Sequence, residues 1–239
     1  DSYPTIQSGI NMAQDGDTVL VSQGLYSENL EITHSITLAS YAIYDDLSNW
    51  VEYSSIFNQW ETTIQNINNT IIDGGENGSC ILIYSEDNSC IDPKIIGFTI
   101  QDGSGTIVER SENINGQIVT EEINIGGGIL FDISNPKINY NKLVNNGSSE
   151  VFDGGAIYAT TNDEDWDFNN RNNTRLRCEV EEFNFNNNLY NNNSALFGNT
   201  LANRGFIDTF DMSESIFDVA NCGTDDIPDA WIFIEEDAE

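Results

Sequence analysis

The sequence predicts an all-β chain built from repeated coils of short strands. Runs rich in Ile, Val, Phe and Tyr alternate with turns rich in Asn, Gly and Asp, which is a pattern typical of strands. Related segments recur along the chain, and periods of about 20 to 50 residues indicate a solenoid. At 239 residues the chain fits one such domain or two small ones.

A short amphipathic helix is expected first, within an N-terminal cap of about residues 1–17. Ile6, Ile10 and Ala13 have helical spacing, and Thr5 can serve as the N-cap. From Thr18 the apolar residues alternate with a period of two, which indicates strands. The strand-like runs cover residues 18–21, 30–40, 70–75, 80–85, 94–103, 126–134, 136–147, 154–160 and 181–198.

Two pairs of segments are internally similar. "DPKIIGFTIQDG" begins at Asp92 and "NPKINYNKLVNN" at Asn135, an offset that we interpret as two coils of about 20 to 25 residues. "GGGIL" at Gly126 and "GGAIY" at Gly154 lie closer together and predict one coil with a longer loop. The Asn runs at 186–188 and 191–193 are expected to form hydrogen-bonded ladders between coils or plain polar turns.

Three segments break this rhythm and are expected to be loops or excursions: residues 41–61, 104–124 and 160–178. We expect the solenoid domain to cover residues 1–215 and to be followed by an acidic segment over residues 216–239. That segment contains the apolar run "WIFI" at 231–234, which must pack on the last coil or on a neighbouring molecule.

The opening "PTIQSGINMAQDGDTVLVSQGLYSENLEI", with "SITLAS", "NTIIDGG", "IIGFTIQDG" and "GGGI" after it, resembles secreted right-handed parallel β-helix proteins with the pectate-lyase-like fold. The resemblance covers roughly residues 3–200. It implies a β-helix of roughly seven to nine coils and a secreted or cell-surface location. It does not specify a reaction, because this superfamily includes lyases, hydrolases, adhesins and surface proteins.

The charge of the chain limits its partners. It has 8 Lys and Arg residues against 40 Asp and Glu residues, giving a net charge of −32. Nucleic acid and anionic membrane surfaces would be repelled. An acidic surface of this kind is also typical of salt-adapted proteins. The sequence contains no run of about 18 apolar residues, the length that a membrane-spanning helix needs. The start at Asp1 without a leader is interpreted as that of a mature, exported protein.

Two acidic groups are candidate calcium ligands, because calcium prefers carboxylate oxygens. They are Asp163, Asp165 and Asp167 in "NDEDWD", and Asp225, Asp226 and Asp229 in "NCGTDDIPDAW". The second segment is similar to the Asp-rich calcium motif of thrombospondin-type-3 repeats. Neither has a complete DxDxDG loop with a closing Glu, so solvated acidic turns are the alternative.

The four cysteines are expected to form disulfides, with a bridge between Cys80 and Cys90 as the first choice and buried free thiols as the alternative. Cys178 and Cys222 would make up the second bridge. Sequons mark possible glycosylation sites at Asn68, Asn77, Asn146, Asn172 and Asn192.

The segment 41–61 is rich in aromatic residues. Trp50, Tyr53, Phe57 and Trp60 would share one face if it were helical. Such a face could pack on the solenoid, stack on a polysaccharide or contact a second subunit.

Candidate catalytic residues are few. The resemblance to polysaccharide lyases implies a basic catalyst, for which Lys94 and Lys137 are repeat-equivalent and would lie two coils apart. A hydrolase would need paired carboxylates, and the candidates are Asp73, Asp132 and Asp153. His34 has no partners typical of a catalytic triad and is expected to be structural.

These observations favour a non-catalytic extracellular structural protein. We expect a self-assembling surface, filament or matrix subunit that associates by stacking of coils or by donation of a strand. The alternative is a carbohydrate-active β-helix enzyme, a polysaccharide-binding module or an adhesin.

Overall fold

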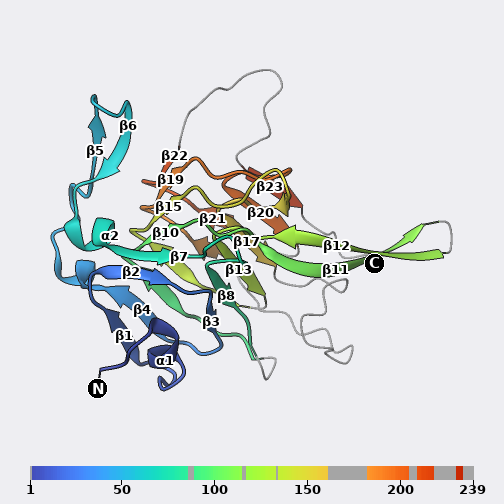
Figure 1. The fold of residues 1–239 in the computed structure, drawn as a ribbon, viewed down its shortest axis with the longest axis horizontal. Coiled ribbons are helices and arrows are strands. Elements are labelled where there is room, and N and C mark those ends of the chain that lie inside the picture. The colour runs from blue at the N-terminus through green and yellow to red at the C-terminus, as the bar shows by residue number, and fades with distance from the viewer. Residues whose placement is uncertain are drawn as a thin grey trace.

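The computed structural model describes residues 2–85, 89–114, 117–132, 134–160, 182–204, 209–217 and 230–233. Three parallel sheets of six strands each dominate this part of the chain (Figure 1). The chain visits sheet A, sheet B and sheet C in turn and then returns to sheet A, so each circuit adds one strand to every sheet. The prediction of an all-β chain with parallel sheets is confirmed.

The three sheets share the same order of circuits from their first to their last strand. Sheet A comprises β1 (Thr18–Val21), β4 (Thr37–Ser40), β9 (Lys94–Ile96), β14 (Lys137–Asn139), β18 (Glu182–Asn184) and β21 (Thr209–Asp211). Sheet B comprises β2 (Gly24–Ser27), β7 (Thr70–Asp73), β10 (Thr99–Gln101), β15 (Lys142–Val144), β19 (Leu189–Asn191) and β22 (Ile216–Phe217). Sheet C comprises β3 (Leu30–Ile32), β8 (Ile81–Ile83), β13 (Ile129–Asp132), β17 (Ile157–Thr160), β20 (Leu201–Arg204) and β23 (Ala230–Phe233).

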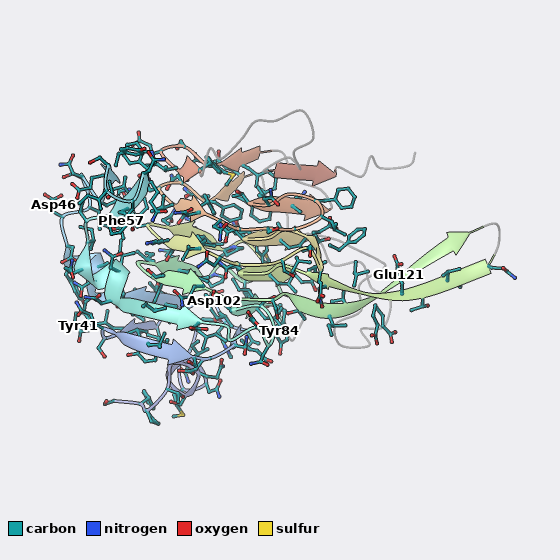
Figure 2. The ribbon with its side chains drawn as sticks, turned by 45° about the horizontal axis from the view of Figure 1, so that its top comes forward. Tyr41, Asp46, Phe57, Tyr84, Asp102 and Glu121 are labelled. Carbon is teal, nitrogen blue, oxygen red and sulfur yellow. The ribbon has the colours of Figure 1, made fainter. Side chains whose placement is uncertain are left out.

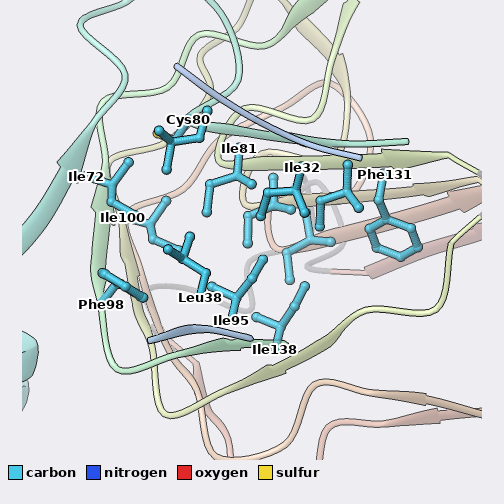
Figure 3. Packing of buried hydrophobic residues seen from close by; sticks show 14 of the residues in the cluster. Ile32, Leu38, Ile72, Cys80, Ile81, Ile95, Phe98, Ile100, Phe131 and Ile138 are labelled. Atoms are coloured by element: carbon cyan, nitrogen blue, oxygen red, sulfur yellow. The ribbon is translucent and has the colours of Figure 1, made fainter. Parts of the chain in front are cut away.

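The core consists of aliphatic and aromatic side chains stacked in register between the sheets (Figure 3). On sheet B, Ile72, Ile100 and Leu143 occupy equivalent positions on neighbouring strands, and all three are fully buried. On sheet C, Ile129 and Ile157 also occupy equivalent positions on neighbouring strands and are fully buried. Each such side chain stabilises the fold by about 1.5–3 kcal/mol through burial. The column explains the Ile-rich sequence, because every circuit must supply the same kind of residue at the same place.

The pairing of strands tests the internal repeats. Ile129 pairs with Ile157, which confirms that the two glycine-led segments are one circuit apart. Lys94 pairs directly with Lys137, so the longer offset is also one circuit and not the two that we expected. The circuit is long because the chain makes an excursion within it. For the same reason, the described strands form six circuits instead of seven to nine.

Buried Asn side chains link successive circuits, as the Asn runs predicted. The Nδ2 of Asn188 donates to the carbonyl oxygens of Ile138 and Phe185, both at 2.7 Å. Its Oδ1 accepts from the backbone N–H of Asn141 at 2.9 Å. Asn141 in turn accepts from the backbone N–H of Phe98 at 3.0 Å, so the ladder spans several circuits.

The N-terminal cap is smaller than expected. Helix α1 (Ile6–Ile10) begins at the predicted cap residue, since the side chain of Thr5 accepts from the N–H of Ser8. Ile6 and Ile10 are buried against the first circuit, but the helix ends before Ala13. The other helical segments are η1 (Tyr41–Tyr44) and α2 (Gln65–Asn69). No helix among the described residues is both long and apolar enough to cross a membrane.

Two of the three expected loops are antiparallel hairpins that project from the sheets (Figures 1 and 2). One hairpin consists of β5 (Val51–Ser54) and β6 (Gln59–Thr62). The other consists of β11 (Thr106–Ile114) and β12 (Gln117–Ile125), and β12 also pairs with β16 (Val151–Asp153). Most of the third segment, residues 161–178, lies outside the described residues.

The C-terminal apolar run is an ordinary strand of the stack. β23 pairs in parallel with β20 of the same chain, with Ala202 opposite Trp231. β22 likewise pairs with β19. The strand therefore has a partner within its own chain, as the first of the two expected arrangements requires. The boundary expected at residues 215 and 216 does not separate these strands from the sheets.

Candidate functional site

The aromatic segment is a hairpin and not the helix that its spacing suggested. Tyr53 and Trp60 lie opposite each other on β5 and β6, and their rings meet edge to face with centroids 5.7 Å apart. Both are exposed, by 50% and 40%, as is Phe57 at the tip. Trp50 is separated from them, because it is only 4% exposed and packs against Tyr140. The four predicted aromatic residues therefore do not form one face. Tyr53, Trp60 and Phe57 are on the surface of the hairpin, and Trp50 is buried.

An ion pair fixes this hairpin to the outer face of sheet B. The Nζ of Lys142 lies 2.9 Å from Glu61 Oε2, and both side chains are largely buried. Burial raises the Glu61 pKa, but the hydrogen bonds from Lys142 and Gln59 and the Lys142 charge outweigh it, so that the pKa is lowered. A contact from Asn191 to Gln59 on the same side of the hairpin is longer, at 3.4 Å. The face bearing Tyr53 and Trp60 is thus held outward.

The three predicted carboxylates lie on three different sheets. Asp73 ends β7 of sheet B, Asp132 ends β13 of sheet C, and Asp153 ends β16 of the small sheet formed with β11 and β12. Asp132 and Asp153 are buried, whereas Asp73 is half-buried. The three carboxylates therefore do not lie on neighbouring strands of one sheet.

Asp102 forms a carboxylate pair with Asp73 that the sequence analysis missed. The Nε2 of Gln101 donates to an oxygen of each, at 2.9 Å to Asp102 and 3.2 Å to Asp73. Burial raises the pKa of Asp102, and the negative charges of Asp73 and Glu76 raise it further against the opposing Gln101 bond. The pairing of Asp73 with Gln101 across β7 and β10 brings the two acids together, and the repeated "DG" after both strands was the available signal.

The substitution Asp102→Asn is expected to stabilise the protein at neutral pH. A carboxyl whose pKa is raised by folding destabilises the fold once it ionises, and this penalty disappears as the pH falls toward the ordinary value of 3.8. Asn also suits the left-handed backbone at this position, where φ is 55°. We expect Tm to rise by about 1–2 °C at pH 7 and by less near pH 4. Thermal melts at both pH values measure this, and an equal or larger gain at acidic pH would refute the assignment.

The predicted basic residues and His34 lie on exposed surface. Lys94 and Lys137 are neighbours on the outer face of sheet A, one strand apart. His34 is exposed, and its Nδ1 lies 3.0 Å from the hydroxyl of Thr33.

All six predicted calcium ligands lie outside the described residues: Asp163, Asp165, Asp167, Asp225, Asp226 and Asp229. Among the residues that are described, no group of three or more His, Cys, Asp or Glu side chains is placed to hold a metal ion.

The pairing expected between Cys80 and Cys90 is wrong. Cys80 is a free, fully buried thiol, whereas Cys90 is disulfide-bonded. Burial raises the pKa of Cys80 to about 12, so the thiol is protonated at neutral pH. It occupies an inward position just before β8, where it packs within the core. Cys178 and Cys222 lie outside the described residues.

The sequons differ in accessibility. Asn146 cannot carry a glycan in the folded chain, because it is fully buried and its Nδ2 donates to the carbonyl oxygen of Ile100 at 2.9 Å. Asn77 and Asn192 are exposed, and Asn68 is half-buried with its Nδ2 donating to Thr62. Asn172 lies outside the described residues.

The first circuit leaves an open depression at the end of the stack. It has a volume of about 600 Å³ and lies between α1, β1 and β2. Four apolar or aromatic side chains on its wall are exposed: Tyr3, Met12, Leu20 and Tyr41. Since β1, β2 and β3 are all outermost strands, their outer hydrogen-bonding edges lie at this same end. Helix α1 covers part of this end. The side chain of Gln7 donates to the C=O of Glu31 on β3 at 3.0 Å and accepts from its N–H at 2.8 Å.

Comparisons of the chain with protein-family models, curated proteins and solved structures gave no match. Arguments about function therefore rest on the geometry of this chain.

Proposed function

We propose that this chain is a non-catalytic extracellular structural subunit whose sheets form a right-handed parallel β-helix that stacks end to end with further copies. The regular passage through sheets A, B and C supports the β-helix. The observation that carries the assembly is the open first-circuit end, where the outermost strands β1 and β2 lie beside a depression with four exposed apolar or aromatic side chains.

The two ends of the stack are suited to each other but not to themselves. The first circuit presents β1, β2 and β3, and the last presents β21, β22 and β23, all running in the same sense in their sheets. Unpaired edges of parallel sheets can continue the ladder with another chain. A contact between the first end of one copy and the last end of the next is heterologous, and such contacts extend into filaments when they do not close.

The charge of the chain sets the conditions for this assembly. A net charge of −32 makes copies repel one another at low ionic strength. Salt shortens the range of that repulsion from about 30 Å at 0.01 M to about 3 Å at 1 M. Stacking should therefore be promoted by salt, and calcium would act more strongly if acidic segments bind it.

The test is sedimentation velocity and negative-stain electron microscopy at about 0.01 M and about 1 M ionic strength. We expect particles longer than one copy at the higher salt concentration. The double substitution Met12→Lys/Leu20→Lys places charge in the depression and should raise the concentration needed for assembly by about tenfold or more.

Ile56→Lys is the matched control, because Ile56 is the most exposed apolar residue of the β5–β6 hairpin and lies away from the depression. It should assemble like the unsubstituted protein. Single-copy particles at both salt concentrations, or normal assembly of the double variant, would contradict the proposal.

A second function, polysaccharide binding, is favoured by the exposed Tyr53–Trp60 pair. Aromatic rings held outward on a fixed hairpin can stack on sugar rings, and the anchoring ion pair limits the entropy lost on binding.

Trp60→Ala should lower retention on whichever of cellulose, chitin or xylan binds the protein, by about tenfold, the equivalent of about 1.4 kcal/mol. Ile56→Ala serves as the control, because Ile56 is an apolar residue of the same hairpin and is more exposed than Trp60, by 86% against 40%. Trp50→Ala is unsuitable, because Trp50 is buried and its loss would affect folding. Equal retention of the Trp60 variant, or no retention of the parent protein, would rule out this function.

A further inference from the structure

Strand β11 has a free hydrogen-bonding edge. In the three-stranded sheet β11–β12–β16, β11 is outermost, and β12 is its one partner among the described strands. Every second residue of an antiparallel strand directs its N–H and C=O away from its partner. The nine residues Thr106–Ile114 therefore present a row of donors and acceptors along the hairpin, which extends away from the stack (Figures 1 and 2).

The base of the hairpin is held firmly. Val108 and Ile125 on one face of the ribbon are buried against Leu130 and Tyr158 on the outer face of sheet C. The opposite face remains open, with Ile107 exposed by 65%. The edge of β11 is therefore presented from a rigid support and needs little ordering before it binds.

A groove of about 570 Å³ borders the first residues of β11. Thr106 and Ile107 form one side, and Leu82 adds a second apolar side chain. The charged residues among its described lining are Glu31, Glu76 and Glu150, which are all exposed. These acids come from three separate circuits, so the negative charge is spread along the groove and not concentrated at one point.

We propose that the edge of β11 and this groove bind an extended segment of another protein in which basic and apolar residues alternate. The segment adds to β11 as a fourth strand, and its main chain pairs with the free N–H and C=O groups. Alternate side chains of a strand point to opposite faces. The apolar side chains on the face toward sheet C therefore contact Leu82, which packs beside Val108, while Lys or Arg side chains reach the glutamates of the groove.

The charge of the chain disfavours a second copy as the occupant. The net charge is −32, so a second copy as a whole is repelled from an acidic groove. The basic residues of the chain are few, 8 Lys and Arg against 40 Asp and Glu, and three of them lie together in the sequence at Arg171, Arg175 and Arg177. The proposal does not rest on end-to-end stacking, because that contact uses the depression beside α1.

The test measures fluorescence anisotropy with a labelled peptide of about eight residues that alternates Lys and Val, a length that matches one edge strand. Two further peptides carry N-methyl groups on either the odd or the even residues, which removes the hydrogen-bond donors on one edge. We expect one of the two to bind at least tenfold more weakly than the parent peptide. The peptide should also slow amide hydrogen exchange within residues 106–114.

The protein variant Glu31→Gln/Glu150→Gln should bind the parent peptide about tenfold more weakly. Its control, Asp46→Asn/Glu52→Gln, removes the same amount of charge from exposed residues remote from the groove. Equal binding of all three peptides would show an electrostatic attraction without strand addition and would overturn the proposal. Equal weakening by the two variants, or unchanged exchange at 106–114, would overturn it as well.

Discussion

The substitution Gly127→Ala is expected to prevent the chain from folding. A Cβ at this position would lie 2.3 Å from the carbonyl oxygen of Gly155 and 2.5 Å from the backbone nitrogen of Gly147. Both atoms belong to the main chain of neighbouring segments, so no side-chain rotation can relieve the overlap. Gly127 also donates its N–H to Gly154 at 2.9 Å, which fixes the spacing of the strands.

The effect should exceed the usual cost of overpacking, about 1–3 kcal/mol, because the backbone itself would have to move on two sides. The soluble yield and the thermal melt followed by circular dichroism measure it, and we expect no cooperative transition. Gly9→Ala is the matched control, since the nearest atom to its Cβ is the side-chain Cγ1 of Val19 at 3.2 Å. A cooperative melt of Gly127→Ala near that of the unsubstituted protein would show that the circuits can separate locally.

The glycine-led repeat predicted neighbouring circuits, whereas the repeat at Asp92 and Asn135 was placed two circuits apart instead of one. Neither repeat predicted how closely the main chains approach. "GGGIL" and "GGAIY" aligned correctly, because the residues of a repeat face the same environment in each circuit. The need for glycine comes from contacts between main chains far apart in sequence. Close packing of the same kind surrounds Cys80, for which a disulfide was wrongly predicted. A Cβ on Gly103 would lie 2.8 Å from the sulfur of Cys80. Spacing of cysteines cannot distinguish a small buried side chain from half of a disulfide.

The two hairpins were missed for different reasons. Residues 104–124 contain Asn115-Gly116 between alternating apolar residues, which is a strong hairpin signal, but they were interpreted as a loop because they interrupt the coil rhythm. In residues 41–61 the aromatic spacing suits one face of a helix and also suits opposite positions of a hairpin with a four-residue turn. Only the pairing of Tyr53 with Trp60 distinguishes the two. The sequence therefore named the aromatic residues of the first hairpin, but not the separation of buried Trp50 from exposed Tyr53 and Trp60. It did not predict the edge of β11 in the second hairpin.

The substitution Asn188→Ala is expected to cause the largest loss of stability among side-chain changes that still allow folding. Asn188 is fully buried and forms hydrogen bonds to groups in two circuits. Alanine would leave the N–H of Asn141 and the carbonyl oxygen of Ile138 buried without these partners. Phe185 would keep the bond from the hydroxyl of Ser215 at 3.1 Å. At about 1–3 kcal/mol for each unsatisfied group, the loss should be roughly 3–5 kcal/mol.

Asn192→Ala is the control, because Asn192 is exposed and its side chain donates to Asn145 Oδ1 at 2.7 Å on the surface of the same stack. Asn192→Ala should lower the free energy of unfolding by about 1 kcal/mol or less. This includes the loss of the preference that Asn has over Ala for a positive φ, which is 53° at this position. Urea unfolding of both variants measures the difference, which should appear as a lower midpoint with an unchanged m-value. If Asn188→Ala loses no more stability than Asn192→Ala, then the Asn residues are polar turns, and the stacked aliphatic columns alone hold the circuits together.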